Sequence, residues 1–345
     1  MNISKFNLIL YTDQFLDDPE MCKTAHCILR FKQSKVKAIF DEKFTGSSLK
    51  NIFPMMEKKI PIINQLNEID QMEDALVIAF APVGGRLSER QKEIINLAIH
   101  HDLFIINCSH EIIAEYHKVL NLRAFNQSEK WIAQGKEFNC TRILTVGTSH
   151  SIGKMTATCL LNNLFQKSGI SSTWIATGQT GTIIADKGTT LDSIPIDFVP
   201  GHLEKMIEEA EKQVNASVII IEGQGSIFHP SYSPTSIALY HTSRPQFLVM
   251  CHRLGQKKFW QFNQDLPSID EAIEAYKKLG DCLQIKSRFI GISLDSSRVS
   301  EQEYLLEKDR LKEKFGLPCF DAIRYPEHLE EILDIFKLEP TLISI

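Results

Sequence analysis

A glycine-rich segment that ends in a lysine is the strongest chemical signal in the sequence. It runs from Gly147 to Thr156 and reads Gly-Thr-Ser-His-Ser-Ile-Gly-Lys-Met-Thr. The backbone N–H groups of such a loop, the positive end of the following helix and a lysine ammonium together bind the phosphates of a nucleotide-type ligand. The segment therefore predicts a phosphate-binding loop, with ligand contacts from Gly147, Thr148, Ser151, Gly153, Lys154, Met155 and Thr156.

The spacing of this loop departs in two ways from the common Gly-x4-Gly-Lys-Ser/Thr form. Gly153 follows Gly147 by six positions (153 − 147), one more than in the common form. Met155 stands where the common form has a serine or threonine, and the nearest hydroxyl comes one residue later. A β-rich run precedes the segment and a helical pattern follows it, which favours a genuine phosphate loop over a chance match.

A carboxylate and an imidazole follow the end of another predicted strand. Glu222 comes directly after the buried run 217–221 and before Gly223-Gln224-Gly225. A carboxylate at this place lies in the crevice where α/β proteins bind ligands, so Glu222 is a candidate general base. Glu222 and Thr156 are also the candidate Mg²⁺ ligands. His229 follows on the same loop and is a candidate acid–base group, because its ordinary pKa lies near neutral pH.

Further polar side chains near strand ends are candidate substrate ligands: Gln179, Thr180, Gln224, Arg86 and His252. Arg86 can bind a carboxylate with two parallel hydrogen bonds, and the alternative is a solvated surface arginine. Cys251 and His252 are neighbours on a predicted strand, so their side chains point to opposite faces. A direct Cys–His catalytic pair is therefore not expected. Asp41, after an early strand, is a weaker candidate of the same kind.

Strand-like and helix-like segments alternate along the chain, which is typical of a parallel α/β sheet. The apolar run 75–81 suits a strand buried on both faces, and 92–100 carries a helical pattern. The polar segment 123–139 separates two parts. We therefore predict an α/β fold in which an N-terminal Rossmann-like domain, 1–130, precedes a P-loop NTPase-like domain with a mainly parallel sheet, 140–345. The first domain has no Gly-x-Gly-x-x-Gly, so no dinucleotide site is predicted there.

The composition argues against a nucleic-acid-binding protein, a membrane-spanning protein and a disulfide-bonded protein. The 345 residues carry a formal net charge of -5, which does not suit a nucleic-acid-binding protein. No apolar run approaches the ~18 residues of a membrane span. The eight cysteines are scattered without a Cys-x-x-Cys pair, as expected for reduced thiols in a cytoplasmic protein. We expect a cytoplasmic homo-oligomer that acts on a small molecule, with no nucleic-acid or membrane partner.

Three motifs together resemble dethiobiotin synthetase and its relatives. Gly147–Lys154 resembles the Gly-Thr-Asp-x-x-Val-Gly-Lys loop of that enzyme. Ala176–Gly181 resembles its Gln-Thr-Gly segment, and Ile221–Gly225 resembles its Glu-Gly-Ala-Gly segment.

Nearly the whole chain is more similar to a bacterial family of formerly unknown function. Its members join an N-terminal Rossmann-like domain to a P-loop domain, and they carry Ile-Glu-Gly-Gln-Gly-Ser-x-x-His-Pro and a later Cys-His. This sequence has these motifs as Ile221–Pro230 and Cys251-His252, and Pro82–Arg86 resembles the family's Pro-x-Gly-Gly-Arg. Ser149 stands where both families tend to have aspartate, which puts a carboxylate contact at this position in doubt.

The resemblance implies an activity, because some members of the family look like D-glutamate N-acetyltransferases. The phosphate loop would then hold the diphosphate of acetyl-CoA, Glu222 or His229 would deprotonate the amine, and Arg86 would hold a carboxylate. Two alternatives stay open: a ligase or kinase that uses ATP and Mg²⁺ to activate a carboxylate, and a nucleotide-controlled binding protein. Met155 and Ser149 weaken the ligase reading, but the sequence does not decide between acetyl-CoA and ATP as the cofactor.

Overall fold

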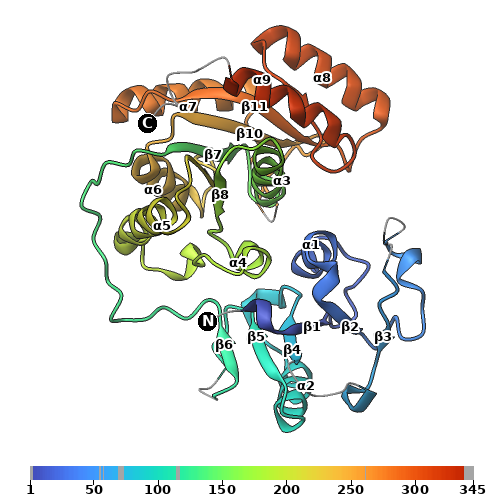
Figure 1. Ribbon diagram of the computed structural model, residues 1–345. Helices are drawn as coiled ribbons and strands as arrows, with labels where there is room; N and C mark the ends of the chain where they lie inside the picture. The colour runs from blue at the N-terminus through green and yellow to red at the C-terminus, as the bar shows by residue number, and fades with distance from the viewer. Residues whose placement is uncertain are drawn as a thin grey trace. The chain divides into compact units, whose positions relative to one another are not determined.

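The chain folds into two compact units, each built on its own sheet (Figure 1). The structure is a computed structural model that describes residues 3–53, 56, 58–68, 74–113, 117–260 and 262–337. The first unit comprises Met1–Gln127 and Gln179–Ser193, and the second comprises Ser128–Gly178 and Ile194–Ile345.

The sheet of the first unit is parallel and has the strand order β3-β2-β1-β4-β5-β6. This order is the Rossmann order, in which the chain builds outward on one side of β1 and then on the other. Strands β1 to β5 are mostly buried and apolar, as parallel strands covered on both faces require, whereas the three residues of β6 are half-buried. Their bounds are β1 Asn7–Tyr11, β2 Val36–Phe40, β3 Ile62–Ile63, β4 Asp74–Ile78, β5 Phe104–Asn107 and β6 Val119–Asn121.

The α-helices in the described residues of the first unit are α1 Lys23–Phe31, α2 Glu89–His100 and α4 Gln179–Ala185. A capping box at Ser88 fixes the start of α2, because the Ser88 hydroxyl accepts from the Gln91 N–H and the Gln91 side chain accepts from the Ser88 N–H. Helix α4 belongs to this unit although it follows the phosphate loop in sequence, because Ile183 lies in the core of the first unit.

The sheet of the second unit is also parallel, with the strand order β12-β11-β10-β7-β9-β8. Strand β7, which leads into the glycine-rich loop, lies between β9 and β10. Their bounds are β7 Thr141–Gly147, β8 Ser172–Ile175, β9 Val218–Ile221, β10 Phe247–Arg253, β11 Arg288–Asp295 and β12 Cys319–Phe320.

The helices of the second unit connect these strands in the α/β manner. They are α3 Lys154–Lys167, α5 Val199–Val214, α6 Ser233–Ser243, α7 Ile269–Leu283, α8 Glu301–Phe315 and α9 Glu331–Lys337. Capping boxes at Ser268 and Ser300 start α7 and α8. Short 3₁₀ helices supplement both units at Ile3–Lys5, Gln33–Lys35, Leu49–Asn51, Leu66–Glu68, Val83–Gly85, Leu191–Ser193, Ile196–Phe198 and Pro326–Glu330.

The predicted fold class is confirmed: two parallel α/β units, the second of which carries a strand–loop–helix arrangement at the phosphate loop. The polar segment 123–139 contains no helix or strand. The predicted limits, 1–130 and 140–345, did not anticipate that Gln179–Ser193 packs with the first unit. In the described part of the chain, no helix has the length and apolar character needed to cross a membrane.

Candidate functional site

The candidate site of the second unit lies where its central strands end. Strand β7 ends at Gly147, β9 ends one residue before Glu222, and β10 ends at Arg253. Because the strands are parallel, these ends meet at the same edge of the sheet, where α/β folds bind their ligands. The strand order β10-β7-β9 therefore brings the phosphate loop and Glu222 to neighbouring strand ends.

The glycine-rich loop bends sharply before α3 begins at Lys154. Gly153 precedes the helix with φ 96°, a left-handed conformation that a side chain disfavours. Ser151 also has a positive φ of 54°. This turn leaves the first N–H groups of α3 without intrahelical partners, so they are available to an anion at the helix start.

Lys154 is buried against the loop that it belongs to. Its exposed fraction is only 6%, and its Nζ donates a hydrogen bond to the Ser149 carbonyl oxygen at 2.6 Å. The charge acts beyond this contact, because the Lys154 ammonium lowers the pKa of His229 in addition to the effect of burial. A buried cation in the loop, whose charge also acts on His229, is well placed to hold a ligand's anionic group.

Met155 and Thr156 are both buried on the first turn of α3. The thioether of Met155 is a poor ligand for Mg²⁺, which prefers oxygen. Within the residues that the structure describes, no three His, Cys, Asp or Glu side chains gather as a metal site. A Mg²⁺ ion would therefore depend on Thr156, Glu222 and oxygens of the ligand, and its assignment to these two residues stays a prediction.

Among the described residues, the buried polar atoms without a hydrogen-bond partner include two at or near the loop whose residues are fully buried. They are the Ser149 hydroxyl and Nε2 of His229, and both residues are 0% exposed. Unsatisfied buried polar groups are rare in native proteins because each costs free energy. Their presence beside a phosphate loop indicates hydrogen bonds that a bound ligand would supply.

His229 is held as a hydrogen-bond donor. The N–H of Ser231 donates to its Nδ1 at 3.1 Å, so the proton of the neutral ring is assigned to Nε2. Burial, together with Lys154, lowers the pKa of His229 and keeps the ring neutral. In this tautomer Nε2 donates a hydrogen bond and has no lone pair for a proton, which favours a donor role over the base role.

Aromatic rings enclose the His229 side chain. The Tyr232 ring stacks on it with centroids 4.5 Å apart, and Phe259 and Phe262 meet it edge-on at 5.0 Å and 5.1 Å. The His150 ring of the phosphate loop also meets it edge-on, at 4.7 Å. These apolar neighbours strengthen any hydrogen bond that Nε2 donates, because they exclude water from it.

Glu222 belongs to a hydrogen-bonded group at the ends of β8 and β9. Its Oε2 accepts the Thr177 N–H at 3.0 Å, and its carbonyl accepts the Thr177 hydroxyl at 2.7 Å. Gln224 Nε2 donates to the Thr177 hydroxyl at 2.9 Å. The next residue must be glycine, since a Cβ at Gly223 would lie 1.7 Å from the Thr145 carbonyl oxygen. The predicted residues Glu222 and Gln224 thus share one partner, Thr177, which the prediction did not include.

His252 contacts the phosphate loop directly. Its Nδ1 lies 2.9 Å from the Thr148 hydroxyl, so it supports a loop residue, and its role as a substrate ligand stays a prediction. The neighbouring Cys251 is fully buried, which raises the pKa of its thiol to about 12. A thiol at that pKa is not a nucleophile near neutral pH, in agreement with the expectation from strand alternation.

The stability of the protein should fall as the pH drops below 6.5, because of His252. Burial lowers its pKa from 6.5 to about 4, so the unfolded chain binds more protons between these values. The contribution of the neutral, buried His252 ring to the free energy of unfolding is complete above pH 6.5 and is lost as the pH falls towards 4. Between pH 7 and pH 5 the free energy of unfolding should fall by about 2 kcal/mol for this reason. Urea unfolding of the wild type and of His252→Gln at both pH values measures it; the same pH dependence in both proteins would contradict the assignment.

Arg253 is a site residue that the sequence reasoning missed. Its Nη2 donates to the Ser151 carbonyl oxygen at 2.6 Å, and its Nε donates to Asp295 at 2.6 Å. The guanidinium therefore fixes the phosphate loop from β10. Its position at a strand end, next to His252, was an available signal. Phe259 and Phe262, which meet the His229 ring, gave none, because they follow a different strand, β10.

Three predicted substrate residues lie in the first unit. The Thr180 hydroxyl is 2.9 Å from that of Thr24, and both residues pack within that unit with Gln179 at the start of α4. Arg86 is exposed after the turn at Gly84 and Gly85. The structure thus does not group these residues with Glu222 in one unit, and their substrate roles stay predictions.

Comparison with known proteins gives matches along most of the chain. Residues 42–132 match the family described as "Domain of unknown function (DUF1611_N) Rossmann-like domain", and residues 129–332 match "Domain of unknown function (DUF1611_C) P-loop domain". The crystal structure of a DUF1611 family protein from Anabaena variabilis matches with a TM-score of 0.85 and 26% identity, covering 95% of this chain and 99% of that one.

Two curated relatives carry an enzyme name. A D-glutamate N-acetyltransferase from Pseudoalteromonas sp is 31% identical over 259 residues, which are 72% of this chain and 77% of the relative. A protein of the same name from Tritonibacter scottomollicae is 29% identical over 261 residues, which are 72% of this chain and 78% of that relative. The resemblance to a family with Rossmann-like and P-loop domains is confirmed.

Proposed function

This chain belongs to the DUF1611 family, and we propose that it is an N-acetyltransferase that moves the acetyl group of acetyl-CoA to the amine of a small acidic amino acid, with D-glutamate as the first candidate. The observation that carries the proposal is the 31% identity over 259 residues to a protein named D-glutamate N-acetyltransferase. The geometry of the second unit supports it in two respects, anion binding and hydrogen-bond donation.

Anion binding suits the diphosphate that coenzyme A carries. The start of α3 offers backbone N–H groups, and Lys154 offers a buried ammonium in the same loop. The Ser149 hydroxyl lacks a partner within the described residues and is a further donor for such an anion. The buried Met155 does not supply the hydroxyl that usually binds Mg²⁺, so the loop suits a diphosphate held without turnover of ATP.

The proposed chemistry uses Glu222 and His229 in different roles. The amine nitrogen bonds to the thioester carbon, the carbon–sulfur bond breaks, and coenzyme A leaves as a thiol. Glu222 takes a proton from the nitrogen and passes it to the departing sulfur, while the extra proton of the substrate ammonium goes to water. His229 Nε2–H would donate to the thioester oxygen as negative charge develops on it, a contribution that a neutral donor in an apolar setting makes well.

A product assay tests this function. The protein is incubated with acetyl-CoA and a panel of D- and L-amino acids, and N-acetyl products and free coenzyme A are measured by mass spectrometry. We expect one N-acetyl product for each coenzyme A released, with D-glutamate among the best substrates. Absence of any product, together with ADP formation from ATP and Mg²⁺ on a carboxylate substrate, would replace the proposal with a ligase.

A further inference from the structure

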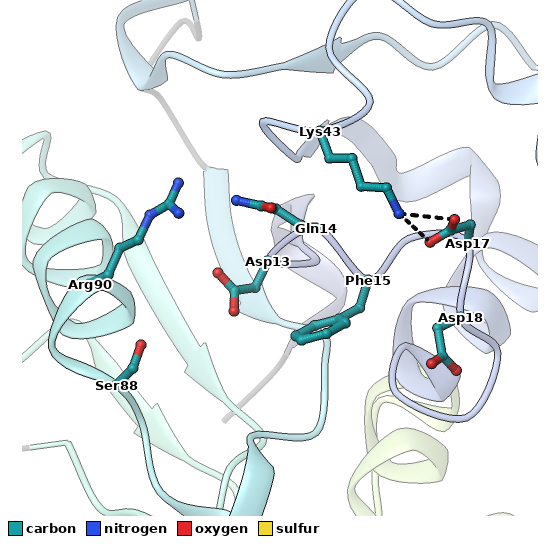
Figure 2. Close-up of a pocket in the computed structure, with 8 residues that line it drawn as sticks. All are labelled: Asp13, Gln14, Phe15, Asp17, Asp18, Lys43, Ser88 and Arg90. Carbon is teal, nitrogen blue, oxygen red and sulfur yellow. Dashed lines mark hydrogen bonds and ion pairs between the residues drawn. The ribbon is translucent and has the colours of Figure 1, made fainter.

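A pocket in the first unit lies outside the site of the second unit. Its cavity measures about 660 Å³, and Figure 2 shows charged side chains from three segments around it. Asp13, Gln14 and Phe15 come from the loop after β1, Lys43 comes from the loop after β2, and Arg90 comes from the first turn of α2. No residue of the phosphate loop or of its partners lines this cavity.

The position of this pocket is the one at which Rossmann sheets bind ligands. The chain adds β2 and β3 on one side of β1, then crosses to add β4 and β5 on the other. Loops on the two sides of such a switch point diverge and leave a crevice at the carboxyl ends of the strands. The pocket residues follow β1, β2 and β4, so they stand at that crevice.

The loop after β1 is held in an uncommon conformation at the pocket. Asp13 and Gln14 both have positive φ, 49° and 69°, although neither is glycine. Such residues persist only where their surroundings fix them, and they cluster at functional sites. Here the buried Asp41 accepts the Gln14 N–H at 3.1 Å, and Asp13 accepts hydrogen bonds from the Tyr11 hydroxyl and from Gln91 Nε2.

Asp41 is therefore a positioning residue. Beyond Gln14, its carboxylate accepts hydrogen bonds from the Thr12 hydroxyl and from the N–H groups of Lys43 and Phe44. It ties the loop after β1 to the loop after β2. With these bonds made inside the fold, Asp41 does not take the ribose-binding role that an acidic residue after β2 has in dinucleotide sites.

The charges around the pocket select against an anionic ligand. Three aspartates line it, Asp13, Asp17 and Asp18, against two cations, Lys43 and Arg90. The loop after β1 has no glycine between Thr12 and Cys22, so it lacks the close backbone approach that a pyrophosphate needs. A simple cation would be attracted by the aspartates but repelled by Lys43 and Arg90. A small molecule with one positive and one negative group can pair with the aspartates and with the two cations.

Lys43 and Arg90 can exchange their present partners for a ligand with little loss of free energy. Arg90 pairs with Glu42, and Lys43 pairs with Asp17, but all four side chains are well exposed. Exposed ion pairs contribute little to stability, so exchanging them for a ligand loses little. In Figure 2 the Gln14 amide points towards Arg90, and Asp13 lies between Arg90 and the Phe15 ring.

We propose that this pocket binds a free amino acid in its zwitterionic form. Arg90 takes the carboxylate, Asp13 accepts from the ammonium, and the Phe15 ring packs against the carbon atoms between them. Each Asp13 oxygen already accepts one hydrogen bond and keeps lone-pair capacity for the ammonium. The proposal concerns the first unit alone and does not depend on acetyl transfer in the second.

Isothermal titration calorimetry on the full-length protein tests the ligand class. The probes are glycine and both enantiomers of alanine and glutamate. N-acetylglycine, which lacks the ammonium, and ethanolamine, which lacks the carboxylate, are the controls. We expect at least one amino acid to bind and both controls to bind about tenfold or more weakly than it does. The proposal would be overturned if no amino acid bound, or if both controls bound as tightly as the amino acid.

Variants locate the binding. Arg90→Gln and Asp13→Asn should each weaken it about tenfold or more, and asparagine tolerates the positive φ that this position requires. Arg30→Gln, at an exposed arginine of α1 that does not line the pocket, is the matched control and should leave the affinity unchanged. Unfolding curves confirm that each variant is folded. Unchanged affinity in both pocket variants would overturn the assignment.

The Lys154→Ala variant separates this site from the phosphate loop of the second unit. Amino-acid binding at the pocket should persist in it. Loss of all amino-acid binding in this folded variant would place the ligand in the second unit and overturn the proposal. Conversely, a failed product assay alongside intact amino-acid binding would count against the proposed function alone.

Discussion

Replacement of Lys154 by alanine is expected to weaken the binding of acetyl-CoA by about tenfold to a hundredfold. The ammonium is buried, lies within hydrogen-bond reach of the loop carbonyl at Ser149, and stands at the start of α3 where a diphosphate would bind. Alanine is the best helix-forming residue, so the fold should survive. Calorimetric titration of wild type and variant with acetyl-CoA measures the change.

Lys167→Ala is the matched control, because this lysine is exposed on the last turn of the same helix. It should leave the affinity unchanged. A second measurement follows from the charge: the Lys154 ammonium lowers the pKa of His229, so this pKa should rise in Lys154→Ala, as followed by NMR titration. Wild-type affinity in a folded Lys154→Ala protein would rule out the phosphate-loop assignment.

Replacement of Glu222 by glutamine is expected to lower kcat by ~10²–10⁴-fold with little change in KM. The substitution keeps the size of the side chain and an oxygen that can accept the Thr177 N–H, but it removes the group that would take the amine proton. A general base acts in the transition state, so its loss appears in kcat. Steady-state kinetics of acetyl transfer across a range of pH measure the effect.

Glu204→Gln provides the control for Glu222→Gln. Glu204 is also a buried carboxylate of the second unit, but its oxygens accept the N–H groups of Gln134 and Lys136 and have a structural role. This variant should change stability while kcat stays at the wild-type value. If a folded Glu222→Gln protein kept the wild-type kcat, Glu222 would be a structural partner of Thr177 and nothing more.

Local spacing carried the prediction of the phosphate loop. Gly147, Gly153 and Lys154 lie in the short segment that joins β7 to α3. Phosphate binding could therefore be predicted there without knowledge of any distant contact. The same holds for Glu222, which follows the buried strand Val218–Ile221 directly. Strand alternation likewise predicts no direct catalytic pair of Cys251 and His252, and the raised pKa of the Cys251 thiol is consistent with this prediction.

Contacts between distant segments could not be predicted in this way. The aromatic surroundings of His229 depend on Phe259 and Phe262, which follow β10. The role of Arg253 depends on β10 lying next to β7. Sequence periodicity reports burial along one element, but it does not report which elements are neighbours.

The amino-acid sequence was enough to predict two parallel α/β units, the phosphate loop and a carboxylate at a strand end, because alternation, glycine placement and apolar runs are local properties. The packing of the folded chain places Gln179–Ser193 in the first unit and directs the Asp41 carboxylate to hydrogen bonds with two loops. The same packing brings Asp13 and Arg90 to one cavity. These arrangements depend on the strand order and on hydrogen bonds between residues that are far apart in the sequence. The free energy of the whole fold determines them, so a short sequence pattern cannot predict them.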